Sequence, residues 1–352
     1  MKKILVTVPT LGAGGMERAA LNFAIMLSRQ NIEVKLFLIS SNTISYNIPD
    51  DIDVFYGKKK VSNKLLIPIS LYKLRKVTKK FKPDFVLSFS GKLSSYVILA
   101  LKGVNDKVIP FHRSSPYRTY GFFNNLLNEM VFPKCKALVV QTYKAKSFFK
   151  DKYGNKNILV IPNPVREIFI DENIKKEKII LSVSRLVKGK GLKQLIDIFS
   201  KIKDKEWKLY ILGKGYLRNE LNQHIKELKL ESQVKLLGFK QNIDYYLSLA
   251  SIFAFTSESE GYPNALLEAM AAGLPCISFD CPTGPNEIID DGVNGFLVPL
   301  GDQKQYIDKL IKLIDNKELR IKFSEEAKKL KETNSLENIS NMLINGLENL
   351  LD

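Results

Sequence analysis

Two glutamates stand eight residues apart in the segment SESEGYPNALLEAMAAGLP (257–275), and their type and spacing could serve ligand binding. Pro263 suits the first turn of a helix, and Gly273 ends that helix. Glu260 would then lie on the loop before the helix, and Glu268 about two turns inside it. A glutamate stabilises a helix dipole only near the N-terminus, so this reason does not explain Glu268. The segment is either a surface helix with two solvated acids or a pocket whose carboxylates accept hydrogen bonds from hydroxyl groups.

A second candidate site follows the apolar run KIILSV and has the sequence SRLVKGKG (184–191). The run predicts a buried strand, and a helix is expected to begin near Leu192. Arg185 and Lys190 would therefore stand at the end of a strand, beside glycines and a helix N-terminus, which is a favourable place for an anion. The alternative is a solvated basic loop, because Lys188 lies nearby and the chain is rich in lysine.

The composition indicates a soluble globular protein, with 352 residues of which 45% are hydrophobic and 26% charged. The first apolar run is too short for a signal peptide, and no run is long enough to span a bilayer. The three cysteines, Cys135, Cys276 and Cys281, lack disulfide or zinc spacing, which favours a reduced, cytoplasmic protein. The net charge of +17 comes from the first half, since residues 1–170 hold 28 basic and 10 acidic residues. Nucleic acid, an anionic membrane or a phosphorylated ligand could each account for this bias.

Short apolar runs alternate with helix-length segments along the chain, for example KILVTVP, EVKLFLIS and PDFVLSFS early and KIILSVSRL, KLYILG and PCISFD later. This alternation predicts an α/β protein with parallel sheets built from βαβ units. Two doubly wound domains of this kind bind ligands at the carboxyl ends of their strands. We predict an N-terminal domain at 1–168, a C-terminal domain at 169–334, and an amphipathic helix at 335–352 that packs on the first domain.

Taken together, these motifs resemble those of the retaining glycosyltransferases of family four, which have the GT-B fold. The resemblance covers nearly the whole chain and rests on five stretches in order: SRLVKGKG, LGKG (212–215), LLGF (236–239), the Glu-x7-Glu segment and CPTGPNEIIDDGVNGFLVP (281–299). Each stretch alone is weak, but their order and spacing are specific. The resemblance implies two Rossmann-like domains facing a central cleft, with the acceptor on the N-terminal domain and the nucleotide-sugar donor on the C-terminal one.

The resemblance also implies roles for individual residues. Arg185 and Lys190 would hold the diphosphate of the donor, Glu268 the ribose hydroxyls, and Glu260 the transferred sugar. Arg185, Lys190, Glu260 and His112 are the catalytic candidates. The other donor-binding candidates, of which Phe239 could equally be an ordinary strand end, are Gly213, Phe239, Lys240, Gly261, Tyr262 and Asn264.

Two segments of the first half follow predicted strands and are expected to border the same cleft. TLGAGGMER supplies Gly12, Gly14 and Gly15, and FHRSSP supplies His112 and Arg113. The glycine spacing is not the G-x-G-x-x-G of dinucleotide-binding proteins, which disfavours a NAD enzyme. By the resemblance, the glycines and Arg113 border the leaving phosphate and the acceptor, and a histidine in this region contacts the donor sugar. A packing turn and a structural histidine are the alternatives.

No metal or organic cofactor is expected. Residues 51–53 formally match the Asp-x-Asp of metal-dependent glycosyltransferases, but they lie in the polar stretch NIPDDIDVFY, which predicts a turn leading into a strand. Arg185 and Lys190 would supply the positive charge instead.

We therefore expect a cytoplasmic enzyme that transfers a hexose or N-acetylhexosamine, with retention, from a nucleotide sugar to a glycan or lipid-linked acceptor. UDP is the expected carrier, and bacterial surface polysaccharide or glycolipid synthesis is the expected setting. By the resemblance the reaction is a front-face displacement without a carboxylate nucleophile, unlike that of retaining hydrolases. The alternatives are a basic nucleic-acid-binding protein, for which no recognition helix or aromatic face is evident, and another GT-B enzyme such as a nucleotide-sugar epimerase or a phosphorylase.

The stretch 57–83 holds ten basic residues and no acidic one. Its apolar residues at helical spacing predict a helix that packs one stripe on the first domain. We expect the remaining basic surface to bind an anionic membrane peripherally, on the inner face, through Lys73, Arg75, Lys76, Lys79 and Lys80. Lysines that are merely solvated are the alternative.

Overall fold

The computed structural model describes residues 1–12, 15–40, 43–57, 67–154 and 157–351, and it divides into two compact units. The N-terminal unit comprises residues 1–163 together with 336–352, and the C-terminal unit comprises Pro164–Ser335. The division therefore falls five residues before the boundary predicted at 168/169. Val165 and Ile168 explain the difference, because both are buried in the core of the C-terminal unit.

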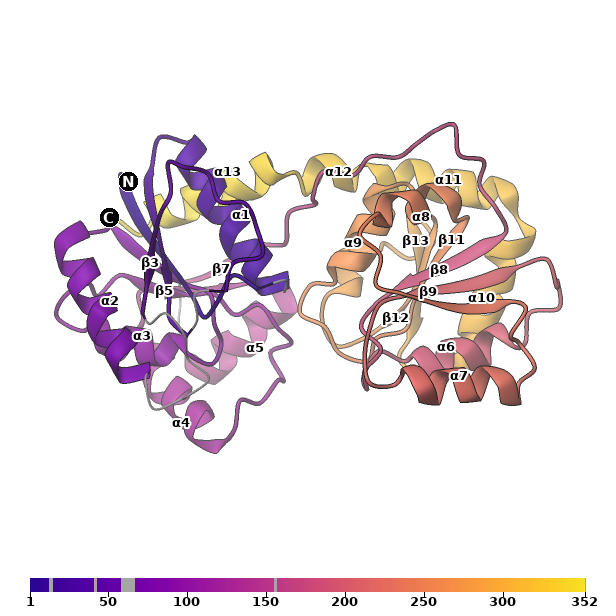
Figure 1. Ribbon diagram of the computed structural model, residues 1–352, viewed down its shortest axis with the longest axis horizontal. Helices are drawn as coiled ribbons and strands as arrows, with labels where there is room; N and C mark the ends of the chain where they lie inside the picture. The colour runs from indigo at the N-terminus through magenta and orange to yellow at the C-terminus, as the bar shows by residue number, and fades with distance from the viewer. Residues whose placement is uncertain (13–14, 41–42, 58–66, 155–156, 352) are drawn as a thin grey trace. The chain divides into compact units, whose positions relative to one another are not determined.

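The N-terminal unit is built on a five-stranded parallel sheet of order β3-β2-β1-β4-β5 (Figure 1). Its strands are β1 (Lys3–Val8), β2 (Glu33–Leu38), β3 (Asp53–Tyr56), β4 (Phe85–Ser88) and β5 (Val108–Pro110). A parallel pair, β6 (Leu138–Val140) and β7 (Ile158–Val160), continues this layer through a bridge between Phe111 and Val139. All residues of β4 and all residues of β1 except Lys3 are buried, which is why these strands lie in continuous apolar runs of the sequence.

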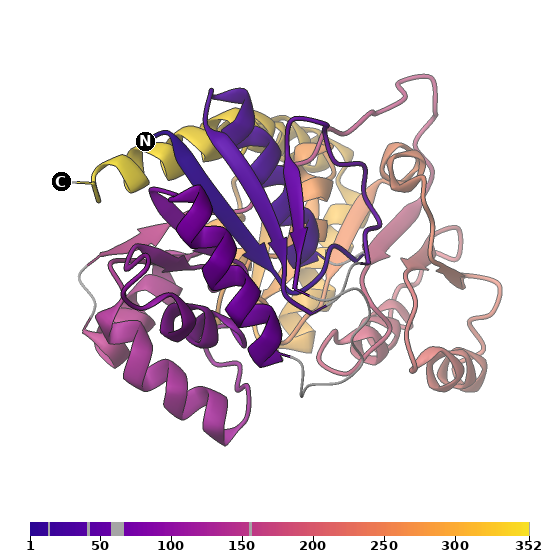
Figure 2. The same ribbon diagram turned by 60° about the vertical axis from the view of Figure 1, so that its left-hand side comes forward.

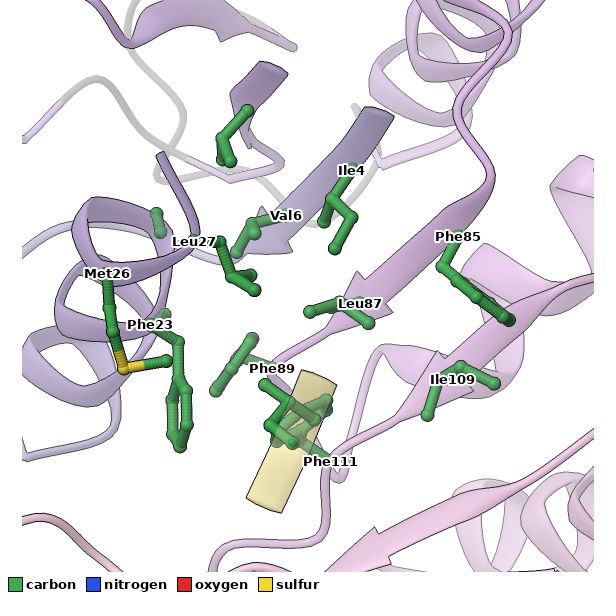
Figure 3. Packing of buried hydrophobic residues seen from close by; sticks show 14 of the residues in the cluster. Ile4, Val6, Phe23, Met26, Leu27, Phe85, Leu87, Phe89, Ile109 and Phe111 are labelled. Carbon is green, nitrogen blue, oxygen red and sulfur yellow. The ribbon is translucent and has the colours of Figure 1, made fainter. Parts of the chain in front are cut away.

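Helices cover both faces of this sheet. They are α1 (Gly15–Arg29), α2 (Ile67–Phe81), α3 (Ser94–Leu101), α4 (Phe122–Val131), α5 (Tyr143–Tyr153) and α13 (Leu336–Glu348), with a 3-10 turn at Phe132–Lys134. Figure 3 shows Phe23 and Leu27 of α1 among side chains of β1, β4 and β5. The rings of Phe89 and Phe111 stack with their centroids 4.1 Å apart in the same cluster.

The helix α13 belongs to the N-terminal unit although 172 residues of the other unit precede it. Ile339, Leu343 and Leu347 are buried in one cluster with β1 and α1, and Leu350 follows them. Figure 2 shows this yellow helix alongside the indigo strands. The apolar residues spaced along 336–350 therefore complete a core whose other members come from the beginning of the chain.

The predicted turn at 51–53 is present, because residues 50–52 form it and β3 begins at Asp53. The Asp53 carboxylate accepts a hydrogen bond from Lys35 Nζ at 2.9 Å on the neighbouring strand. This acid is thus engaged in pairing two strands.

The C-terminal unit has a six-stranded parallel sheet of order β10-β9-β8-β11-β12-β13. Its strands are β8 (Ile179–Val183), β9 (Lys208–Leu212), β10 (Val234–Gly238), β11 (Ile252–Phe255), β12 (Cys276–Asp280) and β13 (Gly295–Pro299). The helices are α6 (Leu192–Phe199), α7 (Arg218–Glu227), α8 (Ile243–Leu249), α9 (Asn264–Ala271), α10 (Gln303–Asp315), α11 (Lys317–Lys328) and α12 (Leu330–Thr333), with a 3-10 turn at Pro285–Glu287. Both units are therefore doubly wound, as the alternation of strands and helices predicted.

Among the helices that the structure describes, none is both long and apolar enough to cross a membrane.

Candidate active site

The strand order of the C-terminal unit reverses between β8 and β11, which are neighbours in the sheet but far apart in the chain. Such a reversal leaves a crevice at the carboxyl ends of the two strands, where α/β sheets bind ligands. The loop after β8 carries Arg185 and Lys190, and the loop after β11 carries Glu260. The fold therefore places three of the four catalytic candidates at one point of one sheet.

Backbone contacts hold these two loops together. Glu258 N–H donates to Gly189 O at 3.0 Å, and the Thr256 hydroxyl donates to Lys190 O at 3.1 Å. Gly191 has a φ of +62°, and a Cβ at this position would lie only 2.0 Å from Thr256 O. Only glycine permits this approach, so the SRLVKGKG loop is fixed against the loop that precedes α9.

Lys190 and Glu260 form an ion pair with 2.5 Å between Nζ and Oε1, and each side chain is 16% exposed. The Thr283 hydroxyl also donates to the backbone carbonyl of Glu260. The loop at 282–285, which follows β12, therefore helps to fix Glu260. Arg185 is exposed, and its guanidinium has no hydrogen-bond or ion-pair partner among the described residues. The site thus has one cation already paired with a carboxylate and a second cation free to meet an anion.

Gly213 was predicted to bind the donor. The packing of the protein around it already requires a glycine at this position. Its φ is +139°, and a Cβ would lie 1.8 Å from the carbonyl oxygen of Ser184, at the end of β8. Its N–H donates to Gly238 O at 2.8 Å. Gly213 therefore draws the ends of β8, β9 and β10 together.

Phe239 and Lys240 follow β10 at the same edge of the sheet. The Phe239 ring is 60% exposed, and Lys214 Nζ lies 5.2 Å from its centroid. An exposed ring beside a cation offers a flat surface on which a base can stack, whereas a strand end would ordinarily bury such a ring. Lys240 is half-buried.

The helix α9 begins at Asn264, so Glu268 is its fifth residue and lies just over one turn inside it. The prediction of about two turns was wrong, because Pro263 is the N-cap and lies outside the first turn. Pro263 as the N-cap makes no side-chain hydrogen bond to the helix. The Gly261-Tyr262-Pro263 corner packs against Gly284, where a Cβ would lie 2.6 Å from Pro263 Cδ.

The Tyr262 side chain does not line the site. It is buried in the core beneath α9, and its hydroxyl accepts a hydrogen bond from Asn334 Nδ2 at 3.1 Å. Burial raises the pKa of Tyr262 to about 12. Only the backbone of this residue can serve a ligand at the corner.

Arg166 was missed in the sequence and holds the Glu268 carboxylate. Its Nε donates to Glu268 Oε2 at 2.9 Å, and its Nη2 donates to Asp244 on α8. Burial alone would raise the pKa of Asp244, but hydrogen bonds from Arg166 and from Phe169 N–H lower it below its usual value. The single available signal was an arginine directly after the PNPV sequence of the domain boundary.

In the N-terminal unit, Gly12 lies after β1 and Gly15 is the first residue of α1. Gly14 lies outside the described residues. The glycine segment thus joins the carboxyl end of the central strand to a helix N-terminus.

His112 is buried directly after β5. Its imidazole lies edge-on to Phe149 with 4.6 Å between ring centroids, and Nδ1 has no hydrogen-bond partner in the part of the chain that the structure describes. Burial lowers the pKa of His112 to about 4, so the ring is neutral at physiological pH. It lines a pocket of about 220 Å³ within the N-terminal unit together with Tyr117, Arg118 and Asn128. A neutral imidazole there can accept or donate a hydrogen bond but cannot supply a charge.

Arg113 lies beside Phe23 and Phe89, whose ring centroids are 5.6 and 5.9 Å from its Cζ. Burial lowers the pKa of Arg113 to about 9, so the guanidinium is charged at neutral pH. Its Nη2 donates to Asn163, whose amide oxygen also accepts from Gln141 Nε2 at 2.5 Å. Arg113 Nη1 and Gln141 Oε1 are buried and have no hydrogen-bond partner among the described residues. Gln141 and Asn163, at the ends of β6 and β7, were not found from the sequence.

Within the described ranges, no three histidine, cysteine, aspartate or glutamate side chains gather as a metal site would require. Cys135, Cys276 and Cys281 are buried free thiols, and burial raises the pKa of Cys281 to about 12.

Two family models together match residues 13–330. Residues 165–330 match "Glycosyl transferases group 1", and residues 13–167 match "Glycosyltransferase Family 4". The amylovoran biosynthesis glycosyltransferase AmsD of Erwinia amylovora is 30% identical, over 93% of this chain and 94% of that protein. The N-acetylgalactosamine-N,N'-diacetylbacillosaminyl-diphospho-undecaprenol 4-alpha-N-acetylgalactosaminyltransferase of Campylobacter jejuni is also 30% identical, over 93% of this chain and 94% of its own.

Among solved structures, Anabaena HepE in complex with UDP gives a TM-score of 0.79 at 18% identity, and the match covers 99% of this chain and 100% of HepE. This likeness concerns the fold, which is GT-B with two Rossmann-like domains. The family models and the two relatives at 30% identity lead to one conclusion: the chain is a glycosyltransferase and belongs to glycosyltransferase family four.

Proposed function

We propose that this glycosyltransferase is a retaining enzyme that transfers a hexose or an N-acetylhexosamine from a UDP-linked donor. The observation that carries the proposal is the Lys190–Glu260 pair beside the unpartnered Arg185 at the strand reversal. Arg185 and Lys190 offset the charge that develops on the departing diphosphate. HepE, which has the same fold, binds UDP, and this supports the choice of nucleotide.

In the proposed reaction the bond between the anomeric carbon and the diphosphate oxygen breaks, and a bond to the acceptor oxygen forms on the same face of the sugar. The acceptor proton passes to the leaving phosphate, so UDP is released and no residue becomes glycosylated. Glu260 is held by Lys190 and serves to position the sugar through its hydroxyl groups. Glu268 accepts hydrogen bonds from the ribose hydroxyls through the oxygen that Arg166 leaves free.

The proposed acceptor is a glycan or a lipid-linked saccharide of bacterial surface polysaccharide or glycolipid synthesis. One relative is named for amylovoran biosynthesis and the other for transfer to a diphospho-undecaprenol saccharide.

A panel of nucleotide sugars tests this proposal in two stages. Thermal unfolding of the wild-type protein with each nucleotide sugar identifies the donor, because a ligand that binds only the folded state raises the midpoint. The product made with that donor is then examined by NMR for the configuration at the anomeric carbon. An α-linked product from an α-linked donor is expected, and an inverted product would refute the retaining mechanism.

EDTA is expected to leave the rate of transfer unchanged. The reason is that Arg185 and Lys190 supply the positive charge that a divalent ion supplies in metal-dependent enzymes. Initial rates are measured with EDTA and with added magnesium or manganese. Activity that disappears with EDTA and returns with either metal would contradict the proposal.

We further propose that the enzyme works in the cytoplasm, bound peripherally to the membrane. The helix α2 packs Leu74, Thr78 and Phe81 inward and exposes Lys73, Lys76, Lys79 and Lys80. Arg75, which the sequence also suggested for membrane binding, makes contacts within the protein. Its Nη1 donates to Ala100 O at 2.7 Å and Lys102 O at 2.9 Å, which caps the carboxyl end of α3. The basic residues at 58–64 lie outside the described residues.

Replacing Lys73, Lys76, Lys79 and Lys80 with serine is expected to reduce the preference of the protein for anionic over neutral vesicles. Each basic residue near an anionic surface contributes about 1 kcal/mol, and salt screens this attraction. Arg75 is kept, so the cap of α3 stays intact. Co-sedimentation with vesicles at low and high salt measures the effect. An unchanged preference in the fourfold variant would rule out α2 as the contact.

A further inference from the structure

The helix α4 presents its apolar side outward. Phe122 is 76% and Phe123 80% exposed, and Leu126 and Met130 on the same side are also exposed. The helix lies at the periphery of the N-terminal unit, packed on α3 (Figure 1). Monomeric proteins seldom expose several large apolar side chains together, and such patches mark interaction sites.

The three asparagines of α4 face the protein and are fixed there by hydrogen bonds. Asn128 is buried, accepts from the Ser95 hydroxyl and donates to Gly91 O at 3.2 Å. Asn124 donates to Tyr120 O at 3.0 Å and accepts from the Tyr96 hydroxyl at 3.2 Å. Asn125 accepts from Tyr120 N–H at 3.0 Å. An amphipathic helix on a water-soluble surface has the opposite orientation, and these bonds prevent α4 from rotating to reach it.

The charge around α4 indicates which partner covers its apolar side. Residues 114–154 contain seven basic residues and two acidic ones. The only acid on α4, Glu129, forms an ion pair with Lys152 at 2.8 Å. Tyr117 and Tyr143 are exposed in the same segment, and tyrosine favours the boundary between lipid and water. Apolar side chains amid basic residues suit an anionic bilayer, whereas a second copy of the chain would bring like charges together.

We propose that α4 inserts Phe122, Phe123, Leu126 and Met130 into the headgroup region of an anionic bilayer. The inference extends the proposed peripheral location and rests on it, but it is independent of the sugar that is transferred. In this arrangement the lysines of α2 attract the protein to the membrane through charge, and α4 anchors it through apolar contact.

The test compares the wild-type protein with the Phe122→Ser/Phe123→Ser variant in co-sedimentation with vesicles. The vesicles contain phosphatidylcholine alone or mixed with phosphatidylglycerol. The variant is expected to bind both kinds of vesicle about tenfold or more weakly, because the loss of apolar insertion does not depend on lipid charge. High salt should weaken vesicle binding by the wild-type protein only in part. If the double variant binds vesicles as strongly as the wild-type protein, the proposal is overturned.

A matched control is Phe169→Ser, which removes a ring of similar exposure from the C-terminal unit and should leave vesicle binding unchanged. Since Phe122 and Phe123 are exposed, the double variant should keep its thermal midpoint and its activity on a water-soluble acceptor. If the wild-type protein shows no glycosyl transfer, the proposed function is refuted, but the vesicle-binding result is unaffected. A wild-type dimer that the double variant converts to a monomer, without loss of lipid binding, would assign the face to a second copy and overturn the proposal.

Insertion depth gives a second readout. The chain has one tryptophan, Trp207, which is buried in the C-terminal unit and provides a constant background. The Phe123→Trp variant should show a blue-shifted fluorescence on anionic vesicles that brominated lipid tails quench. An unshifted, unquenched signal from bound protein would show that attachment is electrostatic only and would overturn insertion by α4.

Discussion

Replacing Lys190 with alanine is expected to lower kcat by about 10²–10³-fold with a much smaller change in KM. The charge on the leaving diphosphate is greatest in the transition state, so the loss of a cation acts on turnover more than on binding. The variant also leaves the Glu260 carboxylate, 16% exposed, without its partner. Replacing Arg185 with alanine should lower kcat by about 10²-fold, because it removes one cation without disturbing a pair. Steady-state rates at varied donor concentration measure both effects.

The control for these variants is Lys188→Ala, which removes an exposed lysine from the same loop and should leave kcat unchanged. Lys190 and Glu260 are in contact, so the Lys190→Ala/Glu260→Ala variant should lose less than the product of the two single losses. If the combined loss of Arg185 and Lys190 leaves turnover intact, both residues are wrongly assigned.

Replacing Glu268 with alanine is expected to weaken binding of UDP by about ten- to a hundredfold, which corresponds to the loss of hydrogen bonds to a charged group. Arg166→Ala should give part of this loss, because the carboxylate then lacks the contact that orients it. The affinity of Arg166→Lys should lie between those of the wild-type protein and Arg166→Ala, since lysine keeps the charge but cannot bridge Glu268 and Asp244 with a planar fork. Calorimetric titration with UDP measures these affinities.

Arg166 is proposed to act through Glu268, and a double variant separates this role from a purely structural one. Once Glu268 is alanine, removal of Arg166 should weaken UDP binding no further. The Asp244→Asn variant is the control for stability, because it weakens the Arg166 clamp without changing Glu268. Tighter UDP binding by Arg166→Ala would mean that Arg166 competes with the ribose, contrary to its positioning role.

Strand and helix order could be predicted because buried parallel strands are continuous apolar runs, and the Pro263 and Gly273 signals bracket α9 closely. The grouping of Arg185, Lys190 and Glu260 was implied by the family resemblance, and the strand order of the C-terminal unit accounts for it. The Arg166 clamp could not be predicted, because its two carboxylates lie 78 and 102 residues away and only the folded chain brings them together. The buried cluster of Arg113, Gln141 and Asn163 could not be predicted for the same reason. The three residues follow β5, β6 and β7, which are distant in sequence.

The orientation of α4 illustrates a different limit. Its sequence, FFNNLLNEMV, separates apolar from polar residues at helical spacing, but periodicity does not say which side faces the protein. The rule that apolar residues lie inside would have turned the helix the wrong way. Instead, Asn124, Asn125 and Asn128 form hydrogen bonds with neighbouring segments, and these bonds determine which side of α4 faces the protein.

The return of α13 to the N-terminal unit sets an order of events during synthesis. Ile339, Leu343 and Leu347 complete a core whose other residues leave the ribosome first, and the 172 residues of the C-terminal unit are made in between. At about 5–20 residues per second, the nascent N-terminal sheet must wait for roughly 10–35 seconds with that surface uncovered. The C-terminal unit is continuous in the chain and ends at Ser335, so it can fold as it emerges and is complete before α13. The second half of the protein is therefore expected to reach its native state before the first.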